Sequence, residues 1–511
     1  MVRALCALAL VLFVSSALGS SVSAQVRNND GILVTPTAYD WPMLMHDSNH
    51  TATVSEPGPY TNNVLAKSTL SGAITTSPAA ANSTIYVITG QTLRALNSST
   101  LSAFWTKSLG SATSSSPASS GGVVYVNEAN GTILAVDGKT GVTDWRIKTT
   151  TTIRSSPTIQ NGMLFVSLYN GTLSAISLST QKVVWRFSSG SHLVASPAAN
   201  GKYVAIGAAN GNEYFLDEAT GTLYWQVPTA AGISSSASFS GPNAYFGSND
   251  TNVYAVDVAT KSTTWTFKTS GLVLSTPIAA DGNVYAASLG GTLYAIDASS
   301  GAKVWTFSSG PVTTSLALAE GTYKGFIPTF KPMLYVVSTT GTIYGVNRAT
   351  GSSVWSLALV GANGGSPIVA YTKIYVGTGS GYFAEIGSLR FTTAAATFDT
   401  SGNYATSFSP TSTVILAANA AWGKYGLRNT YVSVSGPGKG HPLVLINATL
   451  VFVTGNSNYN LYYSFDLSSI QGLKAGTYKV TVATEDANPK FNSNNPRCCG
   501  WVDFKTTFTV T

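Results

Sequence analysis

Short runs of alternating apolar and polar residues recur along most of the chain. In "VVYVNEANGTILAVD", residues 123–137, two runs of β-branched and aromatic residues flank Asn130-Gly131. Asn-Gly favours a two-residue hairpin turn, because both positions need positive φ. Asp137 follows the second run, and an Asp side chain that bonds backbone amides just beyond it favours a turn into a further strand. Together with the short apolar run that precedes it, each such unit is predicted to form a four-stranded antiparallel sheet.

The unit recurs at a fixed period, which is typical of a repeat architecture. A Ser-Pro dipeptide or a close variant opens each unit. These dipeptides mark eight units between Ser77 and Ser366. Six tryptophans stand forty residues apart and a seventh follows after fifty; they are Trp105, Trp145, Trp185, Trp225, Trp265, Trp305 and Trp355.

Eight four-stranded units of about forty residues predict an all-β fold, an eight-bladed β-propeller in which each blade buries its faces against its neighbours. A tryptophan is a large flat side chain with one N–H donor. It is suited to packing between adjacent blades while its nitrogen donates to a backbone carbonyl. We therefore interpret the seven periodic tryptophans as blade-docking residues.

The eighth unit ends after three strands and lacks its tryptophan. A spare strand precedes the first unit, in "NNVLAKSTLSG", where Leu65 stands forty residues before Trp105. We predict that residues 63–69 pair with the strand near 381–385 and complete the last blade. Such pairing would close the ring and remove the free edges that an open repeat exposes.

After about residue 390 the tryptophan period stops. Longer alternating runs divided by turns follow, as in "NTYVSVSGPG" and "AGTYKVTVATED", and they predict a single β-sandwich over residues 391–511. The expected organisation is a signal peptide at 1–24, an N-terminal extension at 25–60, the propeller at 61–390 and the sandwich at 391–511. The segment "GLKAGTYKVTV" resembles the later strands of immunoglobulin-like modules of extracellular proteins.

The first residues have the layout of a secretory signal. Arg3 precedes the apolar stretch "ALCALALVLFV", and small residues ending at Ala24 follow. The apolar stretch is too short to span a bilayer, and no other segment suggests a membrane span. We expect a secreted, extracellular protein.

Composition excludes some functions. Charged residues make up 10% of the chain, against about 25% in ordinary globular proteins. The formal net charge of +7 comes from Lys and Arg residues scattered singly, which argues against nucleic-acid binding.

Seven Asn-x-Ser/Thr sequons are candidate glycosylation sites; alternatively, these residues only favour the turns of β-hairpins. They lie at Asn49, Asn82, Asn97, Asn130, Asn170, Asn249 and Asn447.

The motifs "DGKTGVTDW" and "DEATGTLYW" resemble the docking motif of the PQQ-like repeat propellers, the superfamily of the quinoprotein alcohol dehydrogenases and of a bacterial barrel-assembly scaffold lipoprotein. "DWPMLMHDSNHT", residues 40–51, resembles the segment that often precedes such propellers. The likeness covers roughly residues 40–390. It implies the fold and leaves function open, because this propeller serves both enzymes and inert scaffolds.

One function implied by the resemblance is a PQQ-dependent alcohol or sugar dehydrogenase. Such enzymes stack the quinone on a funnel tryptophan, cover it with a disulfide of adjacent cysteines and hold calcium with carboxylate and amide oxygens. In this chain every tryptophan between 61 and 390 stands at a docking position, and no cysteine lies there. Glu128 and Glu213 are the remaining ligand candidates. We expect no cofactor, with PQQ and calcium only under this alternative.

Histidines do not favour a metal enzyme either. His46 and His50 are four residues apart and could share a metal on a helix, but the surrounding sequence does not favour a helix. We interpret them as part of an N-terminal packing segment, and we expect no metal site.

The preferred hypothesis is a non-catalytic binding or scaffold protein of the extracellular matrix, cell wall or cell surface, with an extracellular protein or polysaccharide as partner. The Ser/Thr runs are expected on the innermost strands, lining a polar channel. Arg154 and His192 would be its conspicuous ionisable side chains. Arg154 is a candidate for holding an anion or carboxylate; the alternative is a solvated arginine at the rim of the channel.

A second contact surface is expected on the segment "EGTYKGFIPTFKPM", residues 320–333, which lengthens the unit with fifty-residue spacing. Aromatic and basic side chains there have the character of a contact surface; they are Tyr323, Lys324, Phe326, Phe330 and Lys331. The alternative is a loop that folds its aromatic side chains onto its own blade.

Cys498 and Cys499, in "PRCCGW", are the only cysteines after the signal. In an oxidising compartment both are expected to be oxidised. Adjacent Cα atoms lie about 3.8 Å apart, short of the usual disulfide range, so a vicinal ring is strained. Closure within one chain has no concentration cost, and we favour the vicinal disulfide over an inter-chain link.

Overall fold

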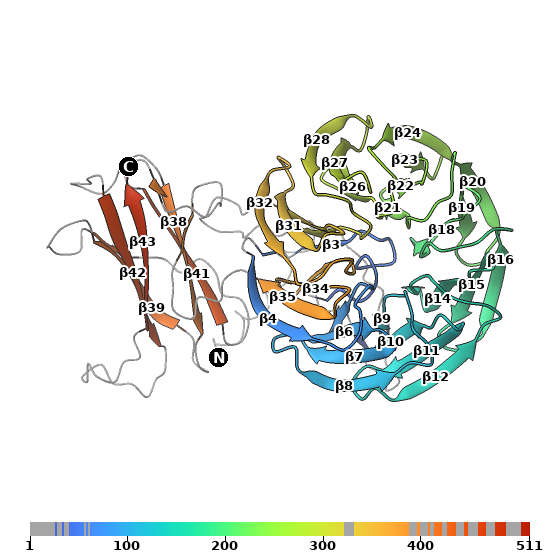
Figure 1. Cartoon of the computed structure of the whole chain (residues 1–511), viewed down its shortest axis with the longest axis horizontal. Helices are drawn as coiled ribbons and strands as arrows, with labels where there is room; N and C mark the ends of the chain where they lie inside the picture. The colour runs from blue at the N-terminus through green and yellow to red at the C-terminus, as the bar shows by residue number, and fades with distance from the viewer. Residues whose placement is uncertain are drawn as a thin grey trace, which may run out of the picture.

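A computed structural model describes residues 40–55, 58–59, 62–320 and 332–387 in full. Elsewhere it describes only strand backbones, which begin with β1 (Val26–Arg27) and β2 (Leu33–Val34). The described residues form strands, turns and loops and contain no helix. Eight sheets of four or five strands surround one axis, so this part of the chain is an all-β, eight-bladed β-propeller, as predicted (Figure 1).

Each blade runs outward from an innermost strand of two or three residues to an outermost strand at the rim (Figure 1). In chain order, the strands of blades 1 to 4 are β5 (Ala79–Ala81), β6 (Thr84–Thr89), β7 (Thr92–Asn97) and β8 (Ala103–Ser108); β9 (Ala118–Ser120), β10 (Val123–Asn127), β11 (Thr132–Asp137) and β12 (Thr143–Lys148); β13 (Thr158–Gln160), β14 (Met163–Ser167), β15 (Thr172–Ser177) and β16 (Val183–Ser188); and β17 (Ala198–Ala199), β18 (Tyr203–Gly207), β19 (Asn212–Asp217) and β20 (Leu223–Pro228).

Blades 5 to 8 repeat this order. Their strands are β21 (Ser238–Ser240), β22 (Asn243–Gly247), β23 (Asn252–Asp257) and β24 (Ser262–Lys268); β25 (Ile278–Ala280), β26 (Asn283–Ala287), β27 (Thr292–Asp297) and β28 (Lys303–Ser308); β29 (Ala317–Ala319), β30 (Met333–Val337), β31 (Thr342–Asn347) and β32 (Ser353–Ala358); and β33 (Ile368–Ala370), β34 (Lys373–Gly377), β35 (Tyr382–Gly387) and β4 (Asn63–Thr69).

The N-terminal strand β4 closes the ring. It pairs antiparallel with β35, with Asn63 opposite Gly387 and Thr69 opposite Tyr382. This is the pairing predicted from the position of Leu65. The eighth blade therefore joins strands from both ends of the repeat region.

Tryptophan side chains bridge most of the blade junctions. Trp105 donates its indole N–H to the carbonyl of Gly138, in the next blade, at 3.0 Å. Trp185, Trp265, Trp305 and Trp355 donate in the same way, at 2.9 to 3.1 Å. The acceptor for Trp355 is Pro59, so a residue next to β4 supplies the carbonyl that a turn supplies at the other junctions.

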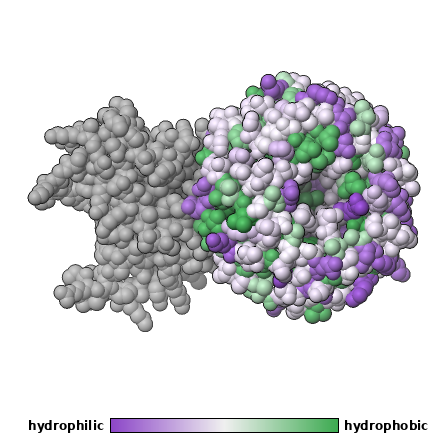
Figure 2. Space-filling model, in the orientation of Figure 1, coloured by the Kyte–Doolittle hydropathy of each residue, from purple (hydrophilic) through white to green (hydrophobic). Residues whose placement is uncertain are grey.

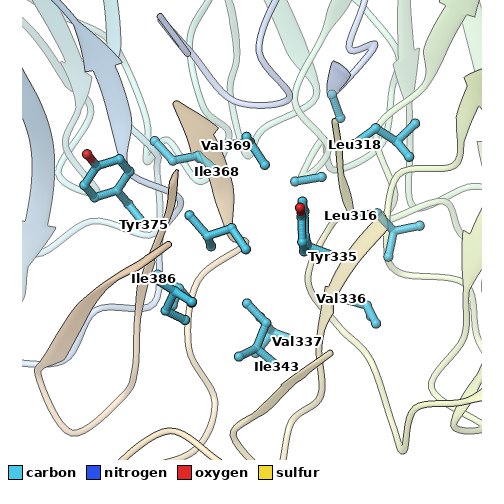
Figure 3. Packing of buried hydrophobic residues seen from close by; sticks show 14 of the residues in the cluster. Leu316, Leu318, Tyr335, Val336, Val337, Ile343, Ile368, Val369, Tyr375 and Ile386 are labelled. Atoms are coloured by element: carbon cyan, nitrogen blue, oxygen red, sulfur yellow. The ribbon is translucent and has the colours of Figure 1, made fainter. Parts of the chain in front are cut away.

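The packed layers between blades are apolar. At the junction of blades 7 and 8, Tyr335 and Val337 from β30 lie near Ile368 and Val369 from β33 (Figure 3). These side chains are fully buried or nearly so. The inner strands β30 and β33 are buried at every position, whereas the outermost strand β32 alternates exposed positions with buried or half-buried ones.

A ring of serine hydroxyls joins the innermost parts of the blades. In blades 2 to 5, the serine hydroxyl at this position accepts a hydrogen bond from the backbone N–H of the equivalent serine one blade earlier. At four successive junctions the donor–acceptor distances are 2.8 to 3.1 Å; the links run from Ser77 to Ser116, Ser116 to Ser156, Ser156 to Ser196 and Ser196 to Ser236.

This arrangement corrects the expectation that the Ser/Thr runs lie on the innermost strands. In blade 2 the innermost strand begins at Ala118, after Pro117, so the run precedes the strand and lies in a loop. Ser115 and Ser116 are buried. Serine at this period therefore reflects hydrogen bonding between blades more than the lining of a channel.

We expect the variant Ser156→Ala to lower the free energy of unfolding by about 1–3 kcal/mol, because it leaves the buried N–H of Ser116 without its acceptor. Urea denaturation of the purified protein measures this change. The control Ser114→Ala removes an exposed hydroxyl from the loop that carries Ser116 and should be nearly neutral. Equal stabilities for the two variants would contradict the role given to the serine ring.

The segment of residues 40–55, here called the plug, runs along the innermost strands inside the ring. Trp41 exchanges two backbone hydrogen bonds with Ala80 of β5. Further along, backbone carbonyls of Pro42, Ser48, Asn49 and Ala52 accept from β9, β17, β21 and β29. Within the plug, β3 (Thr53–Val54) pairs parallel with β29, near the centre of Figure 1. Backbone hydrogen bonds therefore join the plug to five of the eight blades.

Beyond residue 387 the structure describes only the backbone of eight strands. They form two sheets that are separate from the eight blades. The strands are β36 (Ala396–Phe398), β37 (Ser407–Phe408), β38 (Thr413–Ala421), β39 (Leu427–Ser435), β40 (Val444–Asn447), β41 (Asn458–Asp466), β42 (Gly476–Asp486) and β43 (Val502–Val510). The sandwich and its immunoglobulin-like character stay predictions, as do the domain limits.

Candidate functional site

The antiparallel order of the strands gives the ring two different faces. One face, here called the hairpin face, carries the loops that enter the innermost strands and the hairpins between the second and third strands, such as residues 128–131. The opposite face, here called the turn face, carries the turns after the first and third strands. Asp40 accepts a hydrogen bond from the N–H of Asn82, in one of those turns, which places the start of the plug at the turn face.

The plug is anchored by buried side chains. Trp41, Met45 and His50 are each exposed by 1% or less. Nδ1 of His50 lies 2.9 Å from the carbonyl oxygen of Ala237, so Nδ1–H donates and the imidazole is neutral. Burial lowers the pKa of His50 to about 4. Within the described ranges no three His, Cys, Asp or Glu side chains gather around a point suited to a metal ion, and His46 and His50 act in packing.

The two ionisable residues predicted for the channel, Arg154 and His192, lie at exposed positions on the hairpin face. They belong to the loops entering blades 3 and 4, and they meet at Tyr169, in the intervening hairpin of blade 3. The guanidinium carbon of Arg154 lies 4.5 Å from the centroid of the Tyr169 ring. The His192 imidazole stacks on the same ring, with centroids 4.3 Å apart and planes 8° from parallel.

Backbone hydrogen bonds hold this Arg154–Tyr169–His192 cluster in place. The N–H of Tyr169 donates to the carbonyl of Thr152, two residues before Arg154. Nδ1 of His192 lies 2.6 Å from the carbonyl oxygen of Tyr169, to which it donates. A parallel imidazole covers one face of the phenol ring, while the guanidinium gains from the electron-rich π-system. Hydrogen bonds and ring contacts therefore fix the three side chains of the cluster at the rim of the ring.

Sequence reasoning missed Tyr169. The residue before the hairpin turn is Ala129 in blade 2, Ala209 in blade 4 and Leu289 in blade 6, so Tyr169 is the exception. Aligning the repeats on their Asn-Gly turns would have found it. Figure 2, viewed down the axis of the ring, shows a hollow at the centre of the visible face and small apolar patches separated by polar side chains.

The two acidic ligand candidates lie apart from this cluster and differ from each other. Glu128 is buried and accepts hydrogen bonds from the N–H of Gly110 and the amide of Asn130. Glu213 is fully buried, and neither of its carboxyl oxygens has a hydrogen-bond partner. Burial raises the pKa of Glu213 well above its ordinary value. A protonated carboxyl in an apolar layer is a poor ligand for calcium, which prefers ionised oxygens.

The described residues do not fit a calcium-bound quinone. Five of the periodic tryptophans donate across blade junctions, and Trp41 packs inside the plug. No set of three acidic, cysteine or histidine side chains converges in the part of the ring that is described. We therefore assign no step to this cofactor.

The other predicted residues fall into two groups. The contact loop with Tyr323, Lys324, Phe326, Phe330 and Lys331 lies outside the described residues, as do Cys498 and Cys499. Asn447 is described only as backbone of β40.

The remaining sequons lie in the ring or the plug. Asn130 and Asn170 are exposed at hairpin turns, where their side-chain oxygens accept from Thr132 and Thr172. Asn82 is also exposed. Asn97 caps a turn, while the side-chain oxygens of Asn49 and Asn249 are buried. The exposed sequons stay candidates for glycosylation.

In the described residues, no helix is long and apolar enough to span a membrane.

Solved structures share the fold. BamB from Moraxella catarrhalis is 16% identical, with a TM-score of 0.55 over 65% of this chain and 98% of that one. The computationally designed protein Ika8 is 14% identical, with a TM-score of 0.56 over 64% and 99%. Quinohemoprotein alcohol dehydrogenase from Comamonas testosteroni is 13% identical, with a TM-score of 0.57 over 73% and 83%. At these identities the likeness concerns the fold alone.

A search of curated proteins finds no significant match. The family model of PQQ-like repeats described as "Outer membrane protein assembly factor BamB" matches four overlapping segments, residues 50–159, 145–259, 214–323 and 291–435. These segments extend over more than half of the chain and include all eight blades. With its tryptophan-bridged, eight-bladed ring, the chain belongs to this PQQ-like repeat family.

Proposed function

We propose that the chain is a secreted, non-catalytic binding protein and that the Arg154–Tyr169–His192 cluster on the hairpin face is its ligand site. The observation that carries the proposal is the cluster itself. It holds a cation and an imidazole against one aromatic ring at an exposed rim. The partner is an extracellular protein or polysaccharide that presents a carboxylate to Arg154.

The chemistry of the cluster supports an anionic group on the partner. Within the described residues, no carboxylate forms an ion pair with Arg154. Its N–H donors match a carboxylate in geometry, and the aromatic ring reduces the side-chain freedom that binding would otherwise cost. His192 adds a ring nitrogen on the other side of the same phenol.

The plug supports access from this face. Because it lies at the turn face and contacts five blades from inside the ring, a ligand is expected to approach from the hairpin face. The absence of a convergent acid or histidine set in the described residues favours binding over catalysis.

We expect the variants Arg154→Ala and Tyr169→Ala to lose a cross-linked partner that the wild-type protein recovers from its native extracellular material. Loss of a carboxylate–guanidinium contact costs about 1.5–3 kcal/mol, or roughly tenfold to hundredfold in affinity. Quantitative mass spectrometry of the cross-linked material measures recovery.

The matched control is Lys139→Ala, which removes an exposed cation from a turn of blade 2 on the turn face. It should leave recovery unchanged. If Arg154→Ala and Tyr169→Ala recover the partner as well as the wild type does, the hairpin-face site is wrong.

The quinoprotein alternative has one specific support, the fold shared with the Comamonas testosteroni dehydrogenase. Purified protein supplied with PQQ and calcium is expected to show no dye-linked alcohol oxidation above the blank. Turnover well above the blank would replace the binding proposal with an enzymatic one.

A further inference from the structure

Blade 4 departs from the docking arrangement of the other blades. The indole nitrogen of Trp225 is buried and has no hydrogen-bond partner, although five other periodic tryptophans donate to a neighbouring carbonyl. This corrects the prediction that all seven tryptophans dock alike. Trp185 shows the usual geometry: a Cβ added to Gly221 in the facing turn would lie 2.4 Å from its ring. The equivalent turn residue facing Trp225 is Lys261, whose side chain excludes that position.

A second change in blade 4 moves the indole further. Ala205 occupies the position on the second strand where the other blades carry an aromatic residue, for example Phe165 and Tyr245. Phe215 on the third strand takes up the space. The Trp225 ring stacks on it face to face, with centroids 4.1 Å apart and planes 2° from parallel. Trp225 therefore stacks face to face on a ring of its own blade, whereas the other six periodic tryptophans are tilted, with ring centroids 5.8–6.1 Å from the aromatic residue of their second strand.

An aromatic surface results at the outer edge of blades 4 and 5. Leu223 and Tyr224 are exposed by 43% and 45%, and no other strand in the described ranges exposes two consecutive large apolar side chains. Tyr224 lies against Tyr203 and Trp225, with ring centroids 5.2 and 5.3 Å apart. Exposed aromatic clusters of this kind mark binding surfaces more often than isolated apolar residues do.

Two lysines complete this surface on the turn face. Nζ of Lys261 lies 3.7 Å from the centroid of the Tyr224 ring, and Nζ of Lys202 lies 4.9 Å from that of Tyr203. Neither ammonium forms an ion pair in the described part of the chain. The cations are held over the rings while N–H donors stay available to solvent.

The neighbouring carboxylates already have partners. Asp217 accepts from Thr220, and Asp257 accepts from the N–H groups of Ala259 and Thr260. Glu218 accepts from Asn161 and Gly201. The groups that stay free to hydrogen-bond at this surface are therefore mainly donors, namely the two ammonium groups. A matching ligand supplies acceptors.

We propose that Lys202, Tyr203, Leu223, Tyr224, Trp225 and Lys261, here called the blade-4 patch, bind an acidic polysaccharide. The C–H faces of its sugar rings lie against the exposed aromatic surface, and its carboxylates accept from the two ammonium groups. This site is separate from the one under the proposed function, because it lies on the opposite face of the ring.

The test is isothermal titration calorimetry of the full chain with oligogalacturonate, a polymer of uronic acids. Tyr224→Ala and Lys261→Ala are each expected to weaken binding about tenfold, which corresponds to the energy of one aromatic or cation contact, about 1.4 kcal/mol. Raising the salt concentration should weaken wild-type binding, because the ammonium groups are exposed.

Two control variants show whether binding depends on the blade-4 patch. Val304→Ala changes the equivalent exposed residue of blade 6, which is 50% exposed, and should leave affinity within twofold. Arg154→Ala is measured separately: weaker binding by Arg154→Ala reports the hairpin-face site, and weaker binding by Tyr224→Ala and Lys261→Ala reports the blade-4 patch, so the two proposals fail independently. Thermal unfolding of each variant identifies any loss of fold.

Three outcomes with oligogalacturonate or its reduced form overturn the proposal. They are wild-type protein that binds no oligogalacturonate, variants Tyr224→Ala and Lys261→Ala that bind it as wild type does, and equal binding of the carboxyl-reduced neutral polymer. Equal binding of poly-glutamate would also overturn it, since an acidic peptide offers no sugar face.

Discussion

Replacing Trp41 by alanine is expected to lower the free energy of unfolding of the propeller by about 3–5 kcal/mol, the usual cost of truncating a large core side chain. Trp41 is 1% exposed, packs in the cluster shared with blades 1, 6, 7 and 8, and exchanges two backbone hydrogen bonds with Ala80. Urea denaturation followed by circular dichroism measures the loss.

Two further variants serve as controls for Trp41→Ala. Trp41→Phe keeps most of the apolar contact and removes an indole N–H that has no partner, so it should cost less than half as much. Phe104→Ala truncates a side chain that is 58% exposed and should be close to neutral. If Trp41→Ala were as stable as Phe104→Ala, the plug would not be part of the folded core.

Replacing Glu213 by leucine is expected to raise the free energy of unfolding by about 2 kcal/mol or more at pH 7. Glu213 is fully buried and both its carboxyl oxygens lack partners, a condition that costs about 1–3 kcal/mol before any ionisation is counted. The equivalent position in the other blades is apolar and buried; its residues are Leu93, Ile133, Leu173, Val253, Leu293, Ile343 and Phe383. Leucine, as in blades 3 and 6, therefore fits the layer.

The pH dependence of this variant has a defined sign. Burial raises the pKa of Glu213 in the folded protein well above its ordinary value, so the folded state keeps a proton that the unfolded state releases. The contribution of Glu213 to stability is highest below the unfolded pKa, about 4.3, and falls as pH rises toward the folded pKa. Each pH unit in this window costs at most about 1.4 kcal/mol.

The advantage of Glu213→Leu over wild type should therefore grow from acidic to neutral pH. Glu213→Gln is the matched control, since its amide does not titrate yet keeps the unpartnered polar group; its stability should be less dependent on pH than that of wild type. A gain that stays constant between pH 4 and pH 8 would show that Glu213 titrates normally in the folded protein.

The repeat signals predicted most of the ring because each reports a contact with a neighbouring unit. The forty-residue spacing of Trp105 to Trp305 corresponds to one blade, and the period of Ser-Pro corresponds to the hydrogen bonds between adjacent blades. Leu65 predicted the closing strand on the same ground. The role of a repeated residue can be inferred from one sequence, because the same residue type recurs at the equivalent position of each unit.

Other features escaped prediction because they occur once. The plug has no periodicity, and its backbone partners lie from 39 to more than 260 residues away, for example Ala80 from Trp41 and Leu318 from Ala52. Tyr169 and Glu213 are single exceptions at positions where the other blades hold different residues. Arg154 and His192 were identified as candidates, but their meeting at one ring depends on how two adjacent loops fold.

The closing strand has a consequence for synthesis of the chain. The ribosome makes β4 early, but its partner β35 begins at Tyr382, more than 300 residues later. At about 5–20 residues per second, the interval is about 15–60 s. Throughout that time β4 presents an unpaired edge to other nascent chains, and the plug lacks its contact with blade 7 until β29 has been made. The last blade to emerge thus completes both ends of the ring at once, so dependence on chaperones should concentrate in this interval.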